Sequence, residues 1–295
     1  MSRKIRVGSR ESALAVAQSK IVMQCIEENH RDIELELVLI KTTGDVILDR
    51  SLDAIGGKGL FIKELEQALL DGEIDIAVHS YKDMPYEDTP DLPIIALSKR
   101  DSPFDVLVLP EKVTEIDKSK PVGSSSQRRA IQFGMLYNDV DIKPVRGNVH
   151  TRLAKLDSGE YSALILAEAG LNRLNLQNRI NHLFTPEEMI PSGSQGILAV
   201  QGLKGEDHSY LSVFHNRESG IVSNAERQFL NTLGSGCTSP VAVYGELHNN
   251  ELVLVGMYVD DNGNVRKGKL IGDISEAASL GEKLAKSLRI CPEIT

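Results

Sequence analysis

Residues 56–85 read GGKGLFIKELEQALLDGEIDIAVHSYKDMP, and they combine the pattern of a helix with that of a strand. Residues 60–70 repeat apolar side chains at helical spacing, and residues 74–78 form a short apolar run that ends at His79 and Ser80. A helix followed by a buried strand is typical of an α/β unit, in which ligand-binding groups gather where the strands end. The pattern therefore places Lys82 and Asp83 at an expected ligand-binding position.

The same alternation continues on both sides of this stretch. Before it, residues 4–7 and 33–40 are predicted strands and residues 9–28 a predicted helix. After it, the predicted strands are 105–109, 121–123, 142–145 and 163–166, and the predicted helices are 127–136 and a helix from Val149. This order favours two similar α/β lobes with largely parallel sheets. The polar segment 99–103 is interpreted as the crossing between them, with a hinge there as a hypothesis.

From about residue 219 the pattern changes. One predicted helix, 222–233, precedes three strand-like runs, 241–247, 252–259 and 265–271, and a terminal helix begins at Ser275. Asn262-Gly263 is a hairpin turn signal. We therefore expect a small α+β domain with a three-stranded antiparallel sheet.

Composition limits the possible functions. A chain of 295 residues exceeds what one core usually organises, so two or three domains are expected. Tryptophan is absent and the net charge is -9, which argues against nucleic-acid partners because bases need aromatic rings and polyanions are repelled. The N-terminal stretch lacks a secretory pattern, and no run approaches the roughly 18 apolar residues of a membrane span. A cytoplasmic protein without membrane contact is expected.

The three cysteines are too far apart for a disulfide framework or a paired zinc motif, and no motif predicts a metal. Cys25 and Cys291 are interpreted as structural or incidental. Cys237 lies in the loop GSGCTSP, between a predicted helix and a predicted strand, where its sulfur would be accessible to an electrophile. The alternative is a free loop cysteine without a catalytic role.

Basic residues recur beside glycine or serine at predicted strand ends. Small residues let a ligand approach the backbone, and the arginine fork matches a carboxylate or phosphate. The set comprises Arg10, Lys58, Lys82, Arg128, Arg129, Arg146, Arg152 and Arg173. The alternative is that these are ordinary solvated charges. A nucleotide-binding loop at GGKG is rejected, because Leu60 stands where the magnesium-binding hydroxyl should be.

Asp83 would stay ionised among so many cations, and it could stabilise a positive charge that develops on a substrate. The alternative is a local salt bridge or a turn-forming aspartate. His79 is interpreted as a core or sheet-end histidine and is assigned no role.

Seven segments together resemble the porphobilinogen deaminases. They are GSRES, TTGD, residues 56–85, GSSSQRR, RGNVHTRLAKLDSGEYSALILAEAGLNRL, SQG and GSGC, in the order and spacing of that family over essentially the whole chain. The resemblance implies a hydroxymethylbilane synthase of tetrapyrrole (heme) biosynthesis. Such an enzyme condenses four porphobilinogen molecules head to tail, with loss of ammonia, to give hydroxymethylbilane. The sequence leaves the oligomeric state open, and we expect a monomer.

The resemblance also implies a domain organisation. Two α/β lobes would be similar to those of type II periplasmic binding proteins, and the small α+β domain would carry the cofactor. The expected domains are 1–98 plus 197–214 (with the catalytic aspartate), 103–190 (with the basic cleft) and 219–295 (with the attachment cysteine).

Roles follow by matching each position to the family. Asp83 would be the catalytic carboxylate, and Cys237 would hold a dipyrromethane cofactor through a thioether. The cofactor-binding residues would be Cys237, Lys82, Asp83, Ser126, Arg128, Arg129, Arg146 and Gly147. The substrate-binding residues would be Arg10, Ser12, Lys58, Phe61, Arg146, Arg152, Arg173 and Gln195. The spacing of Phe61 by itself favours a core residue of its helix.

The chain departs from the usual family pattern in four places. Ala54 stands where a lysine is frequent, and SKRDSPFD, SGSQG and GSGCTSP replace the common REDPRD, AVGQG and GGCQVP. None of these changes removes Cys237 or Asp83. Two alternatives stay open: a two-lobed anion-binding receptor without enzymatic activity, and a catalytically inactive regulatory relative.

Overall fold

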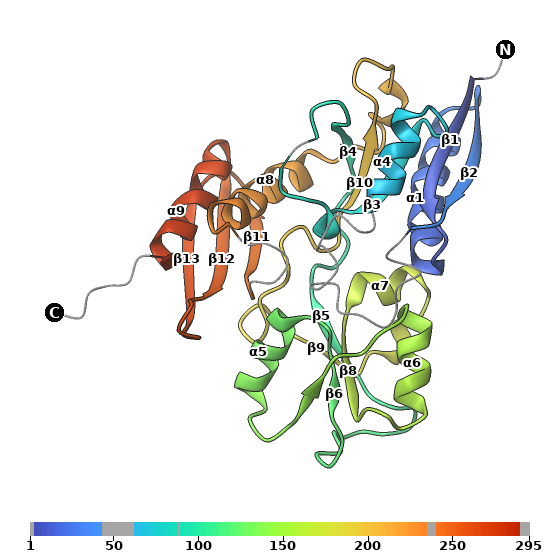
Figure 1. The fold of residues 1–295 in the computed structure, drawn as a ribbon. Helices are drawn as coiled ribbons and strands as arrows, with labels where there is room; N and C mark the ends of the chain where they lie inside the picture. Colours follow the sequence, from blue (N-terminus) through green and yellow to red (C-terminus); the bar gives the residue numbers. More distant parts are fainter. Residues whose placement is uncertain (1–2, 43–61, 88, 235–239, 290–295) are drawn as a thin grey trace. The chain divides into compact units, whose positions relative to one another are not determined.

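The computed structural model describes residues 3–42, 62–87, 89–234 and 240–289 (Figure 1). The chain divides into two compact units. Unit 1 comprises Met1–Asp101 and Gly196–Gly220, and unit 2 comprises Ser102–Gln195 and Ile221–Thr295. The segments expected as the second and third domains both fall in unit 2, and their separation into two domains stays a prediction.

Unit 1 is built on a five-stranded mixed sheet. Its strands are β1 (Arg3–Arg10), β2 (Ile33–Ile40), β3 (Ile76–Ser80), β4 (Ile94–Leu97) and β10 (Leu198–Gly202), in the order β2-β1-β3-β10-β4. β1 runs parallel to β2 and β3, whereas β10 runs antiparallel to β3 and β4. The prediction of a largely parallel sheet therefore holds for β1, β2, β3 and β4, which run in the same direction. Strand β10 is the exception in the described sheet, because it returns from a distant part of the chain and enters in the opposite direction.

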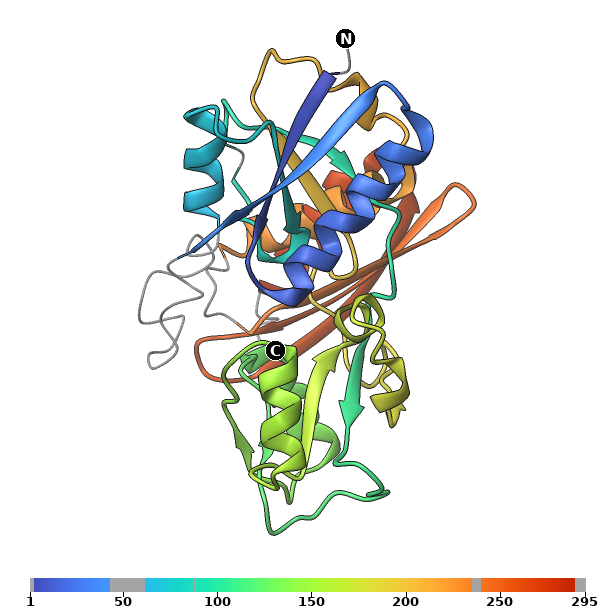
Figure 2. The same ribbon diagram turned by 90° about the vertical axis from the view of Figure 1, so that its right-hand side faces the viewer.

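Helices cover both faces of this sheet, as Figure 2 shows for α1. The helical elements are α1 (Ala13–Asn29), α4 (Lys63–Leu70), η2 (Tyr81–Asp83) and η4 (Ser209–Leu211). Because side chains alternate along a strand, Ile76 and Val78 of β3 pack in the core that α1 covers, whereas Ala77 packs with Leu65 and Leu69 of α4. The predicted helix 9–28 begins later than expected, because Ser9 continues β1.

Unit 2 contains a second five-stranded mixed sheet. Its strands are β5 (Asp105–Val108), β6 (Val122–Gly123), β7 (Ile142–Lys143), β8 (Ala163–Ala167) and β9 (His182–Leu183), in the order β7-β6-β8-β5-β9. β6 is parallel to β7 and β8, but β5 is antiparallel to β8 and β9. The helical elements are α5 (Gln127–Leu136), α6 (Val149–Asp157), α7 (Glu168–Arg173) and η3 (Gln177–Arg179). Phe133 of α5 and Leu156 of α6 lie in separate cores.

The C-terminal part of unit 2 is an antiparallel sheet with helices on one face. Its elements are α8 (Arg217–Thr232, which begins in unit 1), β11 (Ala242–His248), β12 (Glu251–Val259), β13 (Val265–Asp273), η5 (Ile274–Glu276) and α9 (Ala277–Arg289), with strand order β11-β12-β13. Gly263 has φ +82 in the turn between β12 and β13, which confirms the predicted hairpin. The predicted fold class, two α/β lobes and a small α+β part with a three-stranded antiparallel sheet, is confirmed (Figure 1).

Helices α8 and α9 approach each other closely at Gly281. A Cβ atom at this position would lie 2.1 Å from the backbone carbonyl oxygen of Ala225. Backbone cannot rotate aside as the end of a flexible side chain can, so the contact requires glycine.

Gly281→Ala should therefore lower the free energy of unfolding by about 1–3 kcal/mol, the usual cost of overpacking. Gly134→Ala is the matched control, because Gly134 is also helical and nothing lies within 4 Å of an added Cβ atom. That control should keep or raise stability by up to about 1 kcal/mol. Urea unfolding of the three proteins measures both effects, and equal stability of Gly281→Ala and the parent would contradict the close contact.

His79 is a buried residue of β3, as interpreted from the sequence. Burial lowers the pKa of its imidazole from 6.5 to about 4, so the folded protein holds it neutral. The unfolded chain binds a proton at this residue more readily than the folded chain does. The contribution of neutral His79 to the free energy of unfolding is therefore fully present above pH 6.5, and it is lost as the pH drops towards about 4.

His79→Gln should flatten this dependence. Titration of His79 should lower the free energy of unfolding of the parent by about 3 kcal/mol between pH 6.5 and 4. The variant lacks this contribution, so its free energy of unfolding should fall less over the same range. Denaturant unfolding across this pH range measures the difference. Identical slopes for the two proteins would contradict a neutral buried imidazole.

Candidate active site

In unit 1, four predicted site residues lie where strands β1 and β3 end. Because these strands are parallel, Arg10 at the end of β1 and the turn η2 after β3 lie at the same edge of the sheet. Lys82 is half-buried and Asp83 is exposed in η2. Burial is the main cause of the lowered pKa of His79; among the smaller influences, Gln201 and Asp83 raise this pKa and Arg10 lowers it. Ser12 caps α1, and its hydroxyl accepts a hydrogen bond from the Ala15 N–H at 3.3 Å.

In unit 2, the parallel strands β6, β7 and β8 likewise end at one edge. Ser126, Arg146 and Arg173 follow these strands, and they come from the start of α5, the loop after β7 and the end of α7. Ser126 caps α5, because its hydroxyl accepts a hydrogen bond from the Arg129 N–H at 3.4 Å. Strand ends thus bring these predicted residues to the same edge.

Gly147 shapes the loop between β7 and α6. It has φ +107, and a Cβ atom there would lie 2.6 Å from Cγ2 of Thr151, so both conformation and space require glycine. Its carbonyl accepts a hydrogen bond from Nε of Arg152 at 2.8 Å. The next residue, Asn148, caps α6 by accepting from the Thr151 N–H at 2.9 Å. The loop thereby fixes the backbone on which Arg146 lies.

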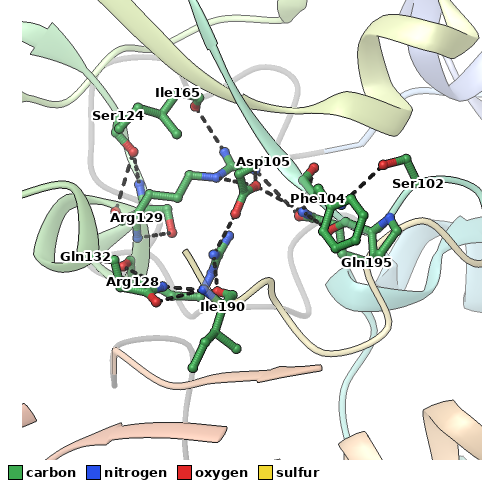
Figure 3. Close-up of polar contacts among 12 residues, drawn as sticks. Ser102, Phe104, Asp105, Ser124, Arg128, Arg129, Gln132, Ile165, Ile190 and Gln195 are labelled. Carbon is green, nitrogen blue, oxygen red and sulfur yellow. Dashed lines mark hydrogen bonds and ion pairs between the residues drawn. The ribbon is translucent and has the colours of Figure 1, made fainter. Parts of the chain in front are cut away.

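Arg128 and Arg129 are buried rather than solvated, and both meet a carboxylate that the sequence did not indicate. Nη1 of Arg128 donates to Oδ2 of Asp105 at 2.7 Å and to the Ile190 carbonyl at 2.8 Å. Arg129 donates to Oδ1 of Asp105 from Nε at 2.9 Å and forms an ion pair with it through Nη2 at 2.7 Å. Figure 3 shows the two guanidinium groups pointing toward this carboxylate.

Gln195 completes the cluster. Its Nε2 donates to Oδ1 of Asp105 at 2.9 Å and to the Pro103 carbonyl at 2.6 Å, and its side-chain oxygen lies 3.5 Å from Nη2 of Arg129 (Figure 3). Gln195 and Asp105 are 1% and 0% exposed. Gln195 therefore contacts both Asp105, which pairs with the two arginines, and Arg129 itself.

The sequence pattern alone suggests the wrong edge of the sheet for Asp105, the first residue of its strand. In a parallel sheet, the first residue of a strand lies at the edge opposite to the carboxyl ends. β5 is antiparallel to β8, however, and the register pairs Asp105 with Ala167, the last residue of β8. The antiparallel strand thus brings Asp105 to the edge where Arg128 and Arg129 lie.

The cluster keeps a net positive charge. Burial raises the pKa of the Asp105 carboxyl, but Arg128 and Arg129 lower it more, so its pKa lies well below the usual value and it is ionised. Two guanidinium groups and one carboxylate leave one positive charge in a buried place. A buried charge is stable only when it is paired. The donor set therefore fits an anionic group, such as the carboxylates of a dipyrromethane.

Several sequence predictions lie outside the described residues. These are Lys58, Phe61, Cys237, Cys291 and the Ala54 variation. Cys25 is described: it packs against the core of unit 1, and burial raises the pKa of its thiol. Over the described part of the chain, acidic, histidine and cysteine side chains form no group suited to a metal ion. Among the described helices, none has the length and apolar character needed to cross a membrane.

Comparisons with known proteins cover nearly the whole chain. Residues 5–210 match the family model described as "Porphobilinogen deaminase, dipyromethane cofactor binding domain", and residues 221–289 match "Porphobilinogen deaminase, C-terminal domain". A porphobilinogen deaminase of Acetivibrio thermocellus is 53% identical over 285 residues, covering 97% of this chain and 98% of that protein. One of Alkaliphilus oremlandii is 54% identical over 286 residues, covering 97% of each.

Among solved structures, the chain is similar to the methionine-binding protein MetQ, with a TM-score of 0.46 and 10% identity over 74% of this chain and 92% of that one. The family assignment depends on the sequence matches, which agree with the resemblance of the seven segments. Both family models match in the expected order, and together they span both units. The chain therefore belongs to the porphobilinogen deaminase family.

Proposed function

We propose that this chain is an active porphobilinogen deaminase that builds hydroxymethylbilane on a dipyrromethane attached to Cys237. The observation that carries the proposal is the buried arginine pair at the strand ends of unit 2, which keeps a positive charge beside Asp105. Family membership supplies the reaction. We further propose the three domains 1–98 plus 197–214, 103–190 and 219–295, and a monomeric cytoplasmic protein without nucleic-acid or membrane partners.

The charge of the substrate explains why the site needs cations. Each porphobilinogen carries an acetate and a propionate, so every added ring contributes two negative charges. The chain itself has a net charge of -9, which repels such a product through its overall field. Local arginine and lysine side chains must overcome this repulsion. The residues proposed to do so are Arg10, Lys58, Lys82, Arg128, Arg129, Arg146, Arg152 and Arg173.

The reaction proceeds through a cation that the protein can stabilise. Porphobilinogen loses ammonia as its aminomethyl C–N bond breaks, which leaves an electron-poor azafulvene. A free pyrrole α-carbon attacks it, a C–C bond forms and the α-carbon loses its proton. Asp83 is proposed to accept a hydrogen bond from the pyrrole N–H and to stabilise the positive charge, because it lies in η2 directly after strand β3 and its side chain is exposed there.

Other groups are proposed to bind and orient the reactants. The dipyrromethane, when bound, supplies the free α-carbon on which the product is built. The Cys237 thiol would lose its proton, and its sulfur would bond to a pyrrole methylene carbon from which ammonia has been lost, which gives the thioether that holds the dipyrromethane. Ser12 and Ser126 lie at helix starts, where hydroxyl and backbone N–H groups can donate to carboxylates. After four additions, water would add to the methylene carbon of the first ring added, the bond from that carbon to the dipyrromethane would break with return of a proton to the pyrrole α-carbon, and the linear tetrapyrrole would leave.

The first test concerns cofactor attachment. The purified parent protein should exceed its chain mass by two pyrrole units and give a red colour with an aldehyde reagent for pyrroles. Cys237→Ser should carry no added mass and should not form hydroxymethylbilane, because serine is a poorer nucleophile than a thiolate. Cys25→Ser is the control and should keep the added mass. A solute receptor would show no added mass in any of the three proteins.

The second test concerns catalysis. Asp83→Asn should still carry the cofactor, but turnover should fall at least about 100-fold, because a fixed charge aimed at the developing cation is lost. Asp71→Asn removes an exposed carboxylate from the same unit and should keep normal turnover. Single-turnover measurement of product formation separates binding from condensation. Near-normal condensation by Asp83→Asn would contradict the assigned role, and a parent protein that is loaded but inactive would indicate a regulatory relative.

A further inference from the structure

We propose that Asp105 is a positioning residue of the cofactor site: it holds Arg128 and Arg129 together so that the Nε–Nη2 edge of Arg128 can take up a carboxylate of the dipyrromethane. The inference deepens the proposed function and depends on it. Asp105 was not among the residues that the sequence indicated. Its role would be exerted through the arginines, without contact with the reacting atoms.

Asp105 brings together two side chains that leave their helix in different directions. Arg128 and Arg129 are consecutive residues of α5, and consecutive side chains leave a helix roughly 100° apart, so they do not face each other. Their guanidinium groups nevertheless meet at one carboxylate. Oδ2 of Asp105 accepts from Arg128 at 2.7 Å, and Oδ1 accepts from Arg129 at 2.9 Å. The two oxygens of Asp105 thus draw together side chains that the helix alone would separate (Figure 3).

Arg128 keeps guanidinium donors that are not used within the described protein, whereas Arg129 does not. Arg129 uses all three side-chain nitrogens: Nε and Nη2 meet Asp105, and Nη1 donates to the Ile165 carbonyl at 3.2 Å. Arg128 uses only Nη1 for its contacts with Asp105 and Ile190. Within the described part of the chain, its Nε–Nη2 edge makes no hydrogen bond. That edge is the side of a guanidinium that binds a carboxylate through two parallel hydrogen bonds.

Asp105 also lowers the repulsion between the two arginines and holds their side chains in place. Two buried guanidinium groups without a carboxylate would repel each other, whereas with Asp105 the cluster keeps one positive charge. Asp105 is itself fixed by Gln195, whose Nε2 donates to Oδ1 at 2.9 Å and to the Pro103 carbonyl at 2.6 Å. Arginines held in this way lose little side-chain freedom when an anion binds. Asp105 thus prepares the pair before the cofactor arrives.

The test measures cofactor loading rather than turnover. The full-length chain is produced in cells that make no porphobilinogen, incubated with porphobilinogen and followed by intact-protein mass spectrometry. Asp105→Asn should load at least about tenfold more slowly, because the arginines lose the group that orients them. Asp105→Glu keeps the charge and should recover part of the rate. Loading of Asp105→Asn at the parental rate would overturn the proposal.

Asp157→Asn is the matched control. Asp157 also pairs with an arginine of unit 2, Arg179, through contacts of 2.7 and 3.1 Å, but it lies on the exposed surface at the end of α6. This variant should load at the parental rate. Equal slowing of both variants would show a general effect of breaking an ion pair and would also overturn the proposal.

A second variant covers the case in which Asp105→Asn does not fold. Gln195→Leu keeps every charge and removes the side-chain hydrogen bonds of Gln195, among them the one to Asp105, and it should slow loading several-fold while thermal unfolding stays cooperative. Parental loading by this variant would refute the positioning role. Failure of the parent itself to load would reject the proposed function, whereas a loaded parent with normally loading variants would reject only the role of Asp105.

Discussion

The buried carboxylate of Asp105 is the constraint on which the cationic end of unit 2 depends. It joins the first residue of β5 to two consecutive arginines of α5, and Gln195 holds it from the segment before β10. Each group would be costly to bury alone, and each is stable because the others are present. Arg128 and Arg129 are charged residues of the kind that usually lie in solvent, but in this arrangement they are buried and held in place.

The position of Asp105 follows from the direction of one strand. Both five-stranded sheets are parallel on one side and antiparallel on the other, with β5 and β10 running against their neighbours. An antiparallel strand begins at the edge where its parallel neighbours end. The sheets can therefore place residues from strand starts beside residues from strand ends, which adds a chain segment to those that supply groups to one edge.

The same geometry explains how a protein with a net negative charge can present local positive charge to anionic ligands. The chain carries a net charge of -9, yet the predicted site cations that the structure describes follow strand ends or lie on the helices that come after them. Backbone N–H groups at the starts of α1 and α5 add to this local field, since Ser12 and Ser126 cap those helices. Local concentration of donors, rather than overall charge, is what suits these edges to carboxylates.

The sequence by itself determined the family, the fold class and most element positions, because periodicity and short motifs are local properties. Helix 127–136 was predicted with its observed bounds, and Ser126, Arg128 and Arg129 were recognised from GSSSQRR. It could not show that these arginines are buried, or that Asp105 lies between them. Those facts depend on the antiparallel register of β5 with β8, a long-range pairing that no local pattern encodes. Tertiary structure alone therefore decided which charges are paired.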